Sequence, residues 1–200
     1  MSGQDSIHFF ANWARERLDE MDAAVTSLEG KAAEVQADAK DKASKVLAEL
    51  RKNRDDFRDA IRKQAGAGEA AWTSAKTKLE TDWSAFEAEV KKYVESYGRE
   101  FELQQATFEL QAAAQLKAWR EAADKLASAA SEFASERRDE IESNVKRMKA
   151  DAVAAEEKLR KLNEAGNQSW SALTAALTET RTIFDRANQT AREAFKRATA

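Results

Sequence analysis

The sequence contains no cysteine, no proline and a single histidine, and these absences exclude several kinds of site. Without cysteine there are no disulfides, thiolate metal sites or cysteine nucleophiles. With His8 as the one imidazole, the chain cannot supply the Glu-x-x-His pair on each of two helices that carboxylate di-iron bundles use. We therefore predict a non-enzymatic protein with no catalytic, cofactor-binding or metal-binding residues and no cofactor.

Turn-forming residues are scarce as well. Glycine occurs only 6 times among the 200 residues, whereas Ala, Glu, Lys, Leu and Arg together make up more than half of the chain. This balance is typical of long helices and coiled coils and disfavours a β-rich fold. Large aliphatic residues are few, but a net charge of only −3 does not drive the chain apart by self-repulsion. The composition predicts an all-α protein.

No strong charge asymmetry and no long apolar run are present. Basic and acidic residues are distributed evenly over the two halves of the chain, so no basic tail or stripe indicates a nucleic-acid partner. The first 18 residues lack the charged start and apolar core of a signal peptide. No apolar run approaches the length of a membrane span. We expect a cytoplasmic protein.

An internal repeat runs through the whole chain. A shift of 98 residues superimposes the large apolar residues and one glycine, and because 98 residues are fourteen heptads, the apolar seam keeps its phase. The main superimposed pairs are Leu28/Leu126, Ile61/Leu159, Gly68/Gly166, Trp72/Trp170, Leu79/Leu177 and Phe86/Phe184. A chance match between two alanine-rich helices explains the shared Gly-x-x-x-Trp spacing poorly. We interpret residues 1–98 and 99–200 as tandem helical units within one continuous domain.

The seam and the glycines predict the architecture. We expect three long helices at about 5–64, 69–163 and 167–199, with breaks at Gly66, Gly68 and Gly166. A single glycine, Gly98, costs a helix about 1 kcal/mol relative to alanine, which a long helix tolerates. The three helices would fold into an elongated antiparallel coiled coil. The alternative is a compact helical bundle in which the central helix is broken near Gly98.

Large side chains at seam positions are the expected structural anchors. They recur at spacings of three, four and seven residues among alanines, which favours packing in a core or interface over a lipid-facing role. The predicted anchors are Trp72, Leu79, Trp83, Phe86, Trp119, Phe133, Trp170, Leu177 and Phe184.

Carboxylate pairs are plentiful, but their surroundings argue against catalysis. General acid–base chemistry needs two carboxyl groups in a partly dry pocket that separates their pKa values. Here Asp55, Asp56 and Asp59 alternate with basic residues in RKNRDDFRDAIRK, and Glu156 and Glu157 do so in EEKLRK. This pattern is typical of ion pairs on a solvated helix face.

Residues 13–97 carry a recognisable series of motifs: an RLDE-like start, an ADAK stretch, an LRxxRDxxR segment, a Gly-x-x-x-Trp break and a Trp-x-x-Phe helix. In these features the segment resembles a group of small bacterial coiled-coil proteins associated with stress responses. Residues 99–200 resemble the group more weakly, because Arg181 stands where the first unit has Trp83. The amphipathic pattern is also distantly similar to that of exchangeable apolipoproteins and of the phasins that coat polyester granules.

Two functions follow from these observations. The first is a non-enzymatic helical protein that self-associates, as a homodimer, and acts as a scaffold or stress-related interaction module. The second is an amphipathic coat for lipid or polymer-granule surfaces, which normally concentrates Lys and Arg on its polar face. Because acidic and basic residues balance here, we favour the first. Neither nucleic acid nor a small-molecule substrate is expected as a partner.

Overall fold

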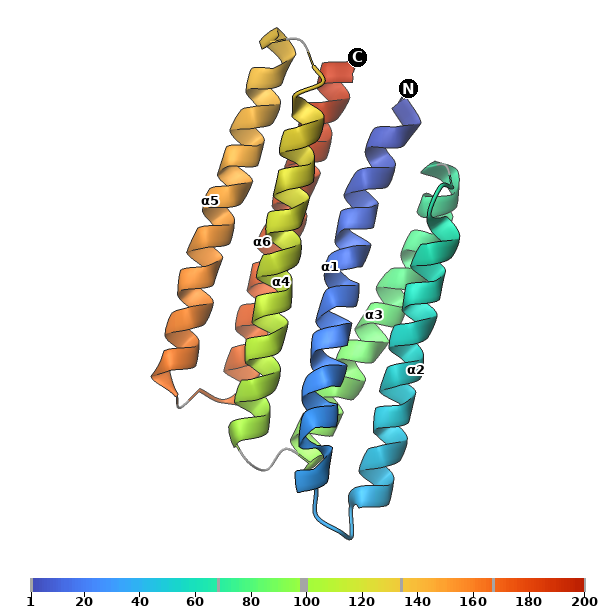
Figure 1. Ribbon diagram of the computed structural model, residues 1–200, viewed down its shortest axis with the longest axis vertical. Helices are drawn as coiled ribbons and strands as arrows, with labels where there is room; N and C mark the ends of the chain where they lie inside the picture. The colour runs from blue at the N-terminus through green and yellow to red at the C-terminus, as the bar shows by residue number, and fades with distance from the viewer. Residues whose placement is uncertain (1, 68, 98–100, 134, 167, 200) are drawn as a thin grey trace. The chain divides into compact units, whose positions relative to one another are not determined.

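The computed structural model describes residues 2–67, 69–97, 101–133, 135–166 and 168–199, and within these the backbone is almost entirely helical (Figure 1). Helix content is 92%, and no strand occurs among the described residues. The prediction of an all-α protein is therefore confirmed. In chain order the elements are α1 (Ser2–Lys31), the 3₁₀ turn η1 (Ala32–Glu34), α2 (Lys40–Gln64), α3 (Glu69–Tyr97), α4 (Phe101–Ala130), α5 (Ser135–Ala165) and α6 (Trp170–Thr199).

The expected three-helix arrangement is not what the structure contains, because two of the three long helices are interrupted. The helix expected at 5–64 ends at Lys31, and Val35 adopts an extended backbone conformation before α2 begins. The helix expected at 69–163 is divided into α3, α4 and α5. Gly98, where the alternative placed a break, lies outside the described residues, between the end of α3 and the start of α4.

The reversal after α4 is held by side chains rather than by glycine or proline. Nη2 of Arg138, in the first turns of α5, donates to the carbonyl oxygens of Ser131 at 3.1 Å and Phe133 at 2.8 Å. Ser131 Oγ donates to the carbonyl oxygen of Ser128 at 2.6 Å. These donors satisfy carbonyl groups that the end of a helix leaves without an intrahelical partner, so the chain can reverse at a sequence that carries no turn residue.

Two of the predicted glycine breaks are true helix ends. Gly66 (φ +84°) and Gly166 (φ +66°) follow the last residues of the α2 and α5 regions in the left-handed conformation that other residues rarely adopt. Gly68, which the 98-residue shift aligns with Gly166, lies outside the described residues. Gly66 and Gly166 therefore share the same left-handed backbone conformation.

The contacts divide the chain into two compact units, and their boundaries fall inside helices. The middle unit comprises residues 17–114, and the terminal unit comprises residues 1–16 together with 115–200. This division differs from the units 1–98 and 99–200 that the sequence repeat defines. Each compact unit takes one half of α1 and one half of α4, which no repeat read along the chain would indicate.

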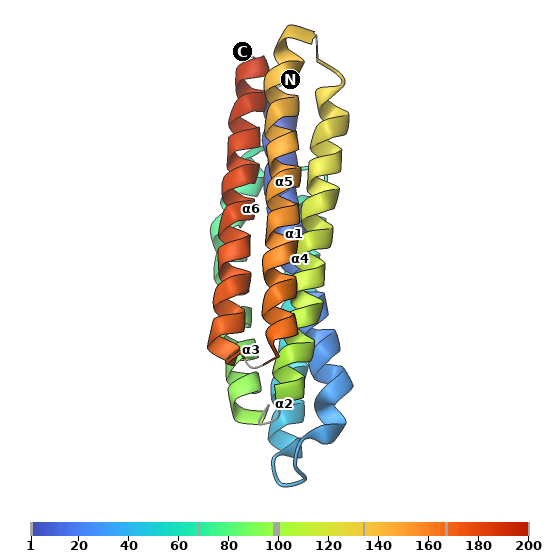
Figure 2. The same cartoon turned by 90° about the vertical axis from the view of Figure 1, so that its left-hand side faces the viewer.

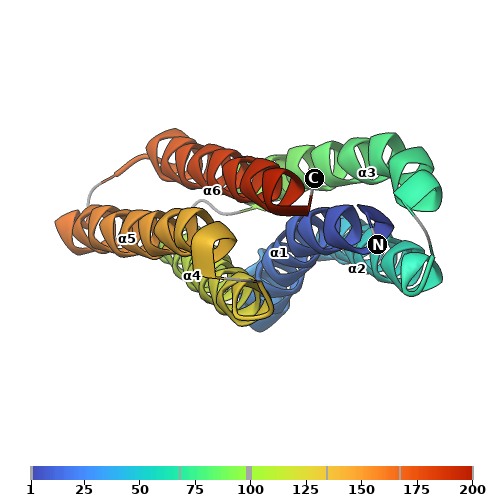
Figure 3. The same cartoon turned by 90° about the horizontal axis from the view of Figure 1, so that it is seen from above.

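In the middle unit, α2 and α3 run antiparallel and side by side (Figures 1 and 3). Alternating three- and four-residue spacing places the apolar residues of each helix on one face, and that face is buried. The core includes Met21, Val25 and Leu28 of α1, Leu50 and Phe57 of α2, and Leu79, Phe86 and Val90 of α3. The terminal unit pairs α5 with α6 in the same way (Figure 2). Its core includes Trp119 and Leu126 of α4, Ile141 and Met148 of α5, and Leu177, Phe184 and Phe195 of α6.

Candidate functional site

The predicted anchors face the interior of their own units. All of them except Phe133 are buried, and Trp119 is 1% exposed. Trp83 stacks near Phe86, with ring centroids 6.2 Å apart, and the edge of one ring of the Trp119–Phe184 pair meets the face of the other at 5.5 Å. Aromatic pairs in such geometries contribute about 0.5–1.5 kcal/mol beyond the area that they bury. Phe133 is half-buried and contacts the Phe195 ring at 5.6 Å.

In the middle unit a buried guanidinium group lies against an indole ring. Arg17, on α1, is 4% exposed, and its guanidinium carbon lies 5.6 Å from the centre of the Trp83 ring on α3. A guanidinium over an indole face is attracted by the electrons of the ring, and the attraction grows as water is excluded. The indole thus serves both as a packing anchor and as part of the environment that makes a buried positive charge tolerable.

The terminal unit has different residues at the corresponding positions. Under the 98-residue shift, Gln115 of α4 corresponds to Arg17 and Arg181 of α6 corresponds to Trp83. Both are buried, and Gln115 Nε2 donates to the carbonyl oxygen of Leu177, one turn before Arg181, at 3.2 Å. The middle unit thus carries its buried guanidinium group on α1, whereas the terminal unit carries an amide on α4 and a guanidinium group on α6. Each unit therefore keeps a polar position at this depth of its core.

Further buried polar residues join helices within each unit. In the middle unit, the hydroxyl oxygens of Ser27 on α1 and Thr107 on α4 are 2.8 Å apart. In the terminal unit, Asn188 Nδ2 on α6 donates to the carbonyl oxygen of Phe9 on α1 at 2.8 Å. Bonds of this kind make helix register specific, because a sliding helix would leave a buried polar group without a partner.

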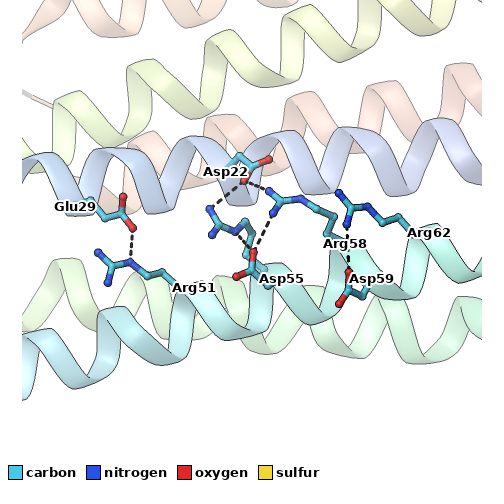
Figure 4. A network of polar contacts seen from close by, with 8 residues as sticks. Asp22, Glu29, Arg51, Asp55, Arg58, Asp59 and Arg62 are labelled. Carbon is cyan, nitrogen blue, oxygen red and sulfur yellow. Dashed lines mark hydrogen bonds and ion pairs between the residues drawn. The ribbon is translucent and has the colours of Figure 1, made fainter.

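A second candidate region is the ion-pair network between α1 and α2 (Figure 4). Asp22 of α1 accepts hydrogen bonds from Arg58 at 2.7 Å and Arg54 at 3.2 Å, and both arginines also bind Asp55, at 3.0 and 2.9 Å. Glu29 of α1 pairs with Arg51 in the same way. The sequence indicated pairs within α2 but not the partners on α1, which lie 22 to 36 residues away.

The acidic residues considered as catalytic candidates all lie on solvated helix faces. Arg58 and Arg54 hold Asp55, Lys52 binds Asp56 at 2.6 Å, and the hydrogen bond from that ammonium group lowers the pKa of Asp56. Arg62 lies 3.6 Å from Asp59. The lowered pKa of Asp56 is the opposite of the raised pKa that a general acid requires.

Glu156 and Glu157 are arranged similarly on α5. Glu156 pairs with Arg120 of α4, and Glu157 accepts from Arg160 at 2.8 Å and lies 3.3 Å from Lys161. The hydrogen bonds from Arg160 and Lys161 lower the pKa of Glu157. The two neighbouring carboxylates thus have different cationic partners and form no shared proton site.

The described part of the chain contains neither a metal-binding cluster nor a helix suited to cross a membrane. No group of three or more His, Asp or Glu residues there is arranged to hold a metal ion. None of the described helices is long and apolar enough to cross a membrane. The side chain of His8 lies outside the described side chains.

Comparison of the chain with protein-family models, with curated proteins and with solved structures found no match. The resemblance of residues 13–97 to stress-associated bacterial coiled-coil proteins therefore stays a prediction.

Proposed function

We propose that this chain is a non-enzymatic helical protein that acts as a scaffold or interaction module through its polar helix faces. The observation that carries the proposal is the burial of the large aromatic anchors inside the chain's own two units. Among the described side chains, the large hydrophobic residues left exposed are Leu110 and Val153. So few exposed large apolar side chains on the described surface suit polar recognition of partners rather than a lipid-facing role.

The helix bounds support a further proposal, that the chain arose by tandem duplication of a 98-residue unit. Adding 98 to Ser2–Lys31 gives 100–129, one residue from the bounds of α4. The same shift takes α2 to 138–162 and α3 to 167–195, within four residues of the bounds of α5 and α6. A three-helix unit that occurs twice thus fits the helix bounds better than a chain with one continuous central helix at 69–163 does.

Self-association as a homodimer, a cytoplasmic location and a role in stress responses complete the proposal. A dimer is expected for the elongated coiled coil, because two helices at each level would leave the aromatic residues of the apolar seam exposed to water. Four helical segments contribute to each unit, and they bury that seam within one chain. A dimer would therefore need either another surface or an exchange of segments between two chains. Sedimentation equilibrium of the purified chain over a wide concentration range tests it directly.

The scaffold role is tested by incubating the protein with anionic vesicles, neutral vesicles and polyester granules. We expect full helicity in buffer by far-ultraviolet circular dichroism, no gain of helicity with lipid, and no co-sedimentation. Binding to vesicles or granules, accompanied by loss of the tertiary tryptophan signal, would replace this proposal by the alternative.

That alternative, an amphipathic coat for lipid or granule surfaces, is favoured by one specific observation. Both cores contain buried polar or charged side chains, among them Arg17, Glu20, Gln111 and Arg181. A buried charge costs free energy unless it is well paired, so a core that holds several loses less on opening than a purely apolar core does. Variants Arg17→Met and Arg181→Met separate the two roles. Vesicle binding by a surface coat should follow the measured stability of each variant, falling where the core becomes harder to open and rising where it becomes easier, whereas a scaffold should be unaffected in this assay.

A further inference from the structure

The terminal unit is completed by a helix from the far end of the chain. Its residues 115–200 supply part of α4 together with α5 and α6, while residues 1–16 supply the first half of α1 (Figure 1). In the middle unit the corresponding place is taken by the first half of α4, which follows α3 directly in the sequence. Each unit is thus completed by half of a helix. In the middle unit this half-helix is adjacent in sequence to the rest of the unit, whereas in the terminal unit it comes from the other end of the chain.

A small set of contacts holds the first half of α1 in the terminal unit. We call the residues that receive it, Phe133, Asn188 and Phe195, the seat. The Phe9 ring meets the Phe195 ring edge to face at 5.5 Å, and Phe195 also contacts Phe133. Asn188 Nδ2 binds the carbonyl oxygen of Phe9. Ala14, one to two turns further along α1, is fully buried. The three partner residues, Phe133, Asn188 and Phe195, all belong to residues 115–200 of the terminal unit.

The interface between this segment and its seat is mixed in character. Phe9 and Ala14 are apolar, but Asn12 and Glu16 are buried beside them. Asn12 Nδ2 and Asn188 Oδ1 have no hydrogen-bond partner in the described part of the chain. Buried polar atoms without partners cost free energy, so these two atoms reduce what the apolar contacts of the closure contribute.

We propose that the seat formed by α6 and by Phe133 after α4 is an interaction surface for a second copy of this chain, whose α1 residues 9–16 take the place of the chain's own. The exchanged contacts are identical to those described, so the two arrangements differ mainly in the entropy of association and in strain at the connections between units. Those connections lie within α1 at Glu16–Arg17 and within α4 at Ala114–Gln115. This inference deepens the proposed self-association by giving it a surface, and it does not depend on the scaffold role.

The test is complementation between two defective chains. Phe9→Ala damages the inserted helix and leaves the seat intact, whereas Phe195→Ala damages the seat and leaves the helix intact. An affinity-tagged Phe9→Ala chain is refolded at high concentration with an untagged Phe195→Ala chain, and the tagged chain is recovered. In a mixed dimer, the intact helix of one chain enters the intact seat of the other. We expect retention of the untagged chain to exceed that in either self-pairing by about tenfold.

Two further variants keep the result interpretable. Asn188→Ala replaces Phe195→Ala as a milder seat variant, and circular dichroism verifies that every chain used is helical. The matched control pairs Ser27→Ala with Thr107→Ala, which alters the closing helix of the middle unit, where we expect no complementation. Equal retention in all pairings would show a dimer formed through another surface, and no retention in any pairing would show that α1 closes only its own chain. Either result overturns the exchange. Vesicle binding is measured separately and decides the scaffold role on its own.

Discussion

The two units bury the same kinds of residue at corresponding depths but solve the problem of a buried polar position differently. The middle unit places a guanidinium, Arg17, over the ring of Trp83. The terminal unit places an amide, Gln115, against a backbone carbonyl and carries its cation, Arg181, on the opposite helix. The comparison indicates that the level of the polar position is constrained more tightly than its chemistry. A helix pair can exchange which member holds the charge, provided that the polar groups obtain partners.

The largest test of this comparison is removal of one anchor from each unit. We expect Trp72→Ala in the middle unit and Trp170→Ala in the terminal unit each to lower the free energy of unfolding by about 3–5 kcal/mol, because a large buried ring is replaced by a cavity. Denaturant unfolding measures the cost, and hydrogen exchange resolved by helix assigns it to a unit. A loss below about 1 kcal/mol in either unit would mean that its anchor does not hold the core together.

The glycine ends of α2 and α5 should behave alike. Gly66→Ala and Gly166→Ala place a Cβ on a left-handed residue, which costs about 1–2 kcal/mol. An added Cβ meets no atom within 4 Å at Gly66 and only the Glu164 carbonyl oxygen, at 3.8 Å, at Gly166. The cost is therefore conformational, and thermal unfolding should show similar shifts for the two variants. A large difference between them would disprove the equivalence of the two helix ends.

A double-mutant cycle isolates the feature in which the units differ. Arg17→Met and Trp83→Leu, made singly and together, should reveal a coupling of about 0.5–2 kcal/mol between guanidinium and ring. The control cycle uses Gln115→Leu and Arg181→Met. It should show a smaller coupling, because Gln115 donates to the backbone carbonyl oxygen of Leu177, which neither change removes. Equal couplings in both cycles would show that the guanidinium–indole interaction does not set the middle unit apart from the terminal unit.

Surface ion pairs should matter least to stability in both units. Replacing Asp22, which two arginines bind in the middle unit, should cost up to about 1 kcal/mol, and replacing Glu156 in the terminal unit under about 0.5 kcal/mol. Both losses should shrink in 1 M salt, which screens exposed charges. Costs that equal those of the tryptophan changes, or that persist in high salt, would identify a functional or structural role that we have not assigned.

Alkaline pH should lower the stability of the middle unit before that of the terminal unit, without any mutation. Tyr93 of the middle unit is buried, and burial raises the pKa of its phenol above the ordinary 10.0. Its contribution to stability is therefore complete below pH 10 and is lost as the pH rises through the raised value. The terminal unit has Ala191 at the corresponding position. Hydrogen exchange above pH 10 should accelerate first in the middle unit, and Tyr93→Phe should abolish that difference.

Much of the fold followed from local pattern. The period of the apolar seam depends only on neighbouring residues, so it predicts helices and which residues, such as Trp119 and Leu177, lie on the apolar face. The reversals after α1 and α4 did not follow, since neither contains proline or a pair of nearby glycines, and a lone glycine such as Gly30 is tolerated inside a helix. The second depends on Arg138, whose role in binding the carbonyl groups of Ser131 and Phe133 is visible only once α5 has folded back.

The polar features were harder to predict for the same physical reason. A charge run such as that around Asp55 indicates a solvated face, but the partner helix is chosen by tertiary packing, which places Asp22 of α1 beside Arg58. The burial of Arg17 was equally hard to predict. A charged residue in a helix is normally assigned to the solvent-exposed face, and only the folded structure places the Trp83 ring beside it. Long-range pairing of this kind leaves no periodic signal.

The turn between α4 and α5 has a consequence for the conformational landscape of the chain. Residues Ser131–Phe133 include no glycine or proline, so this stretch has no intrinsic bar to continuing as a helix. The closest competitor of the hairpin is therefore a straightened form in which α4 passes directly into α5 and the freed carbonyl groups are satisfied along the helix axis. The balance between the two is set by how much packing energy α5 gains on folding back. Any condition that weakens this packing raises the population of the straightened form.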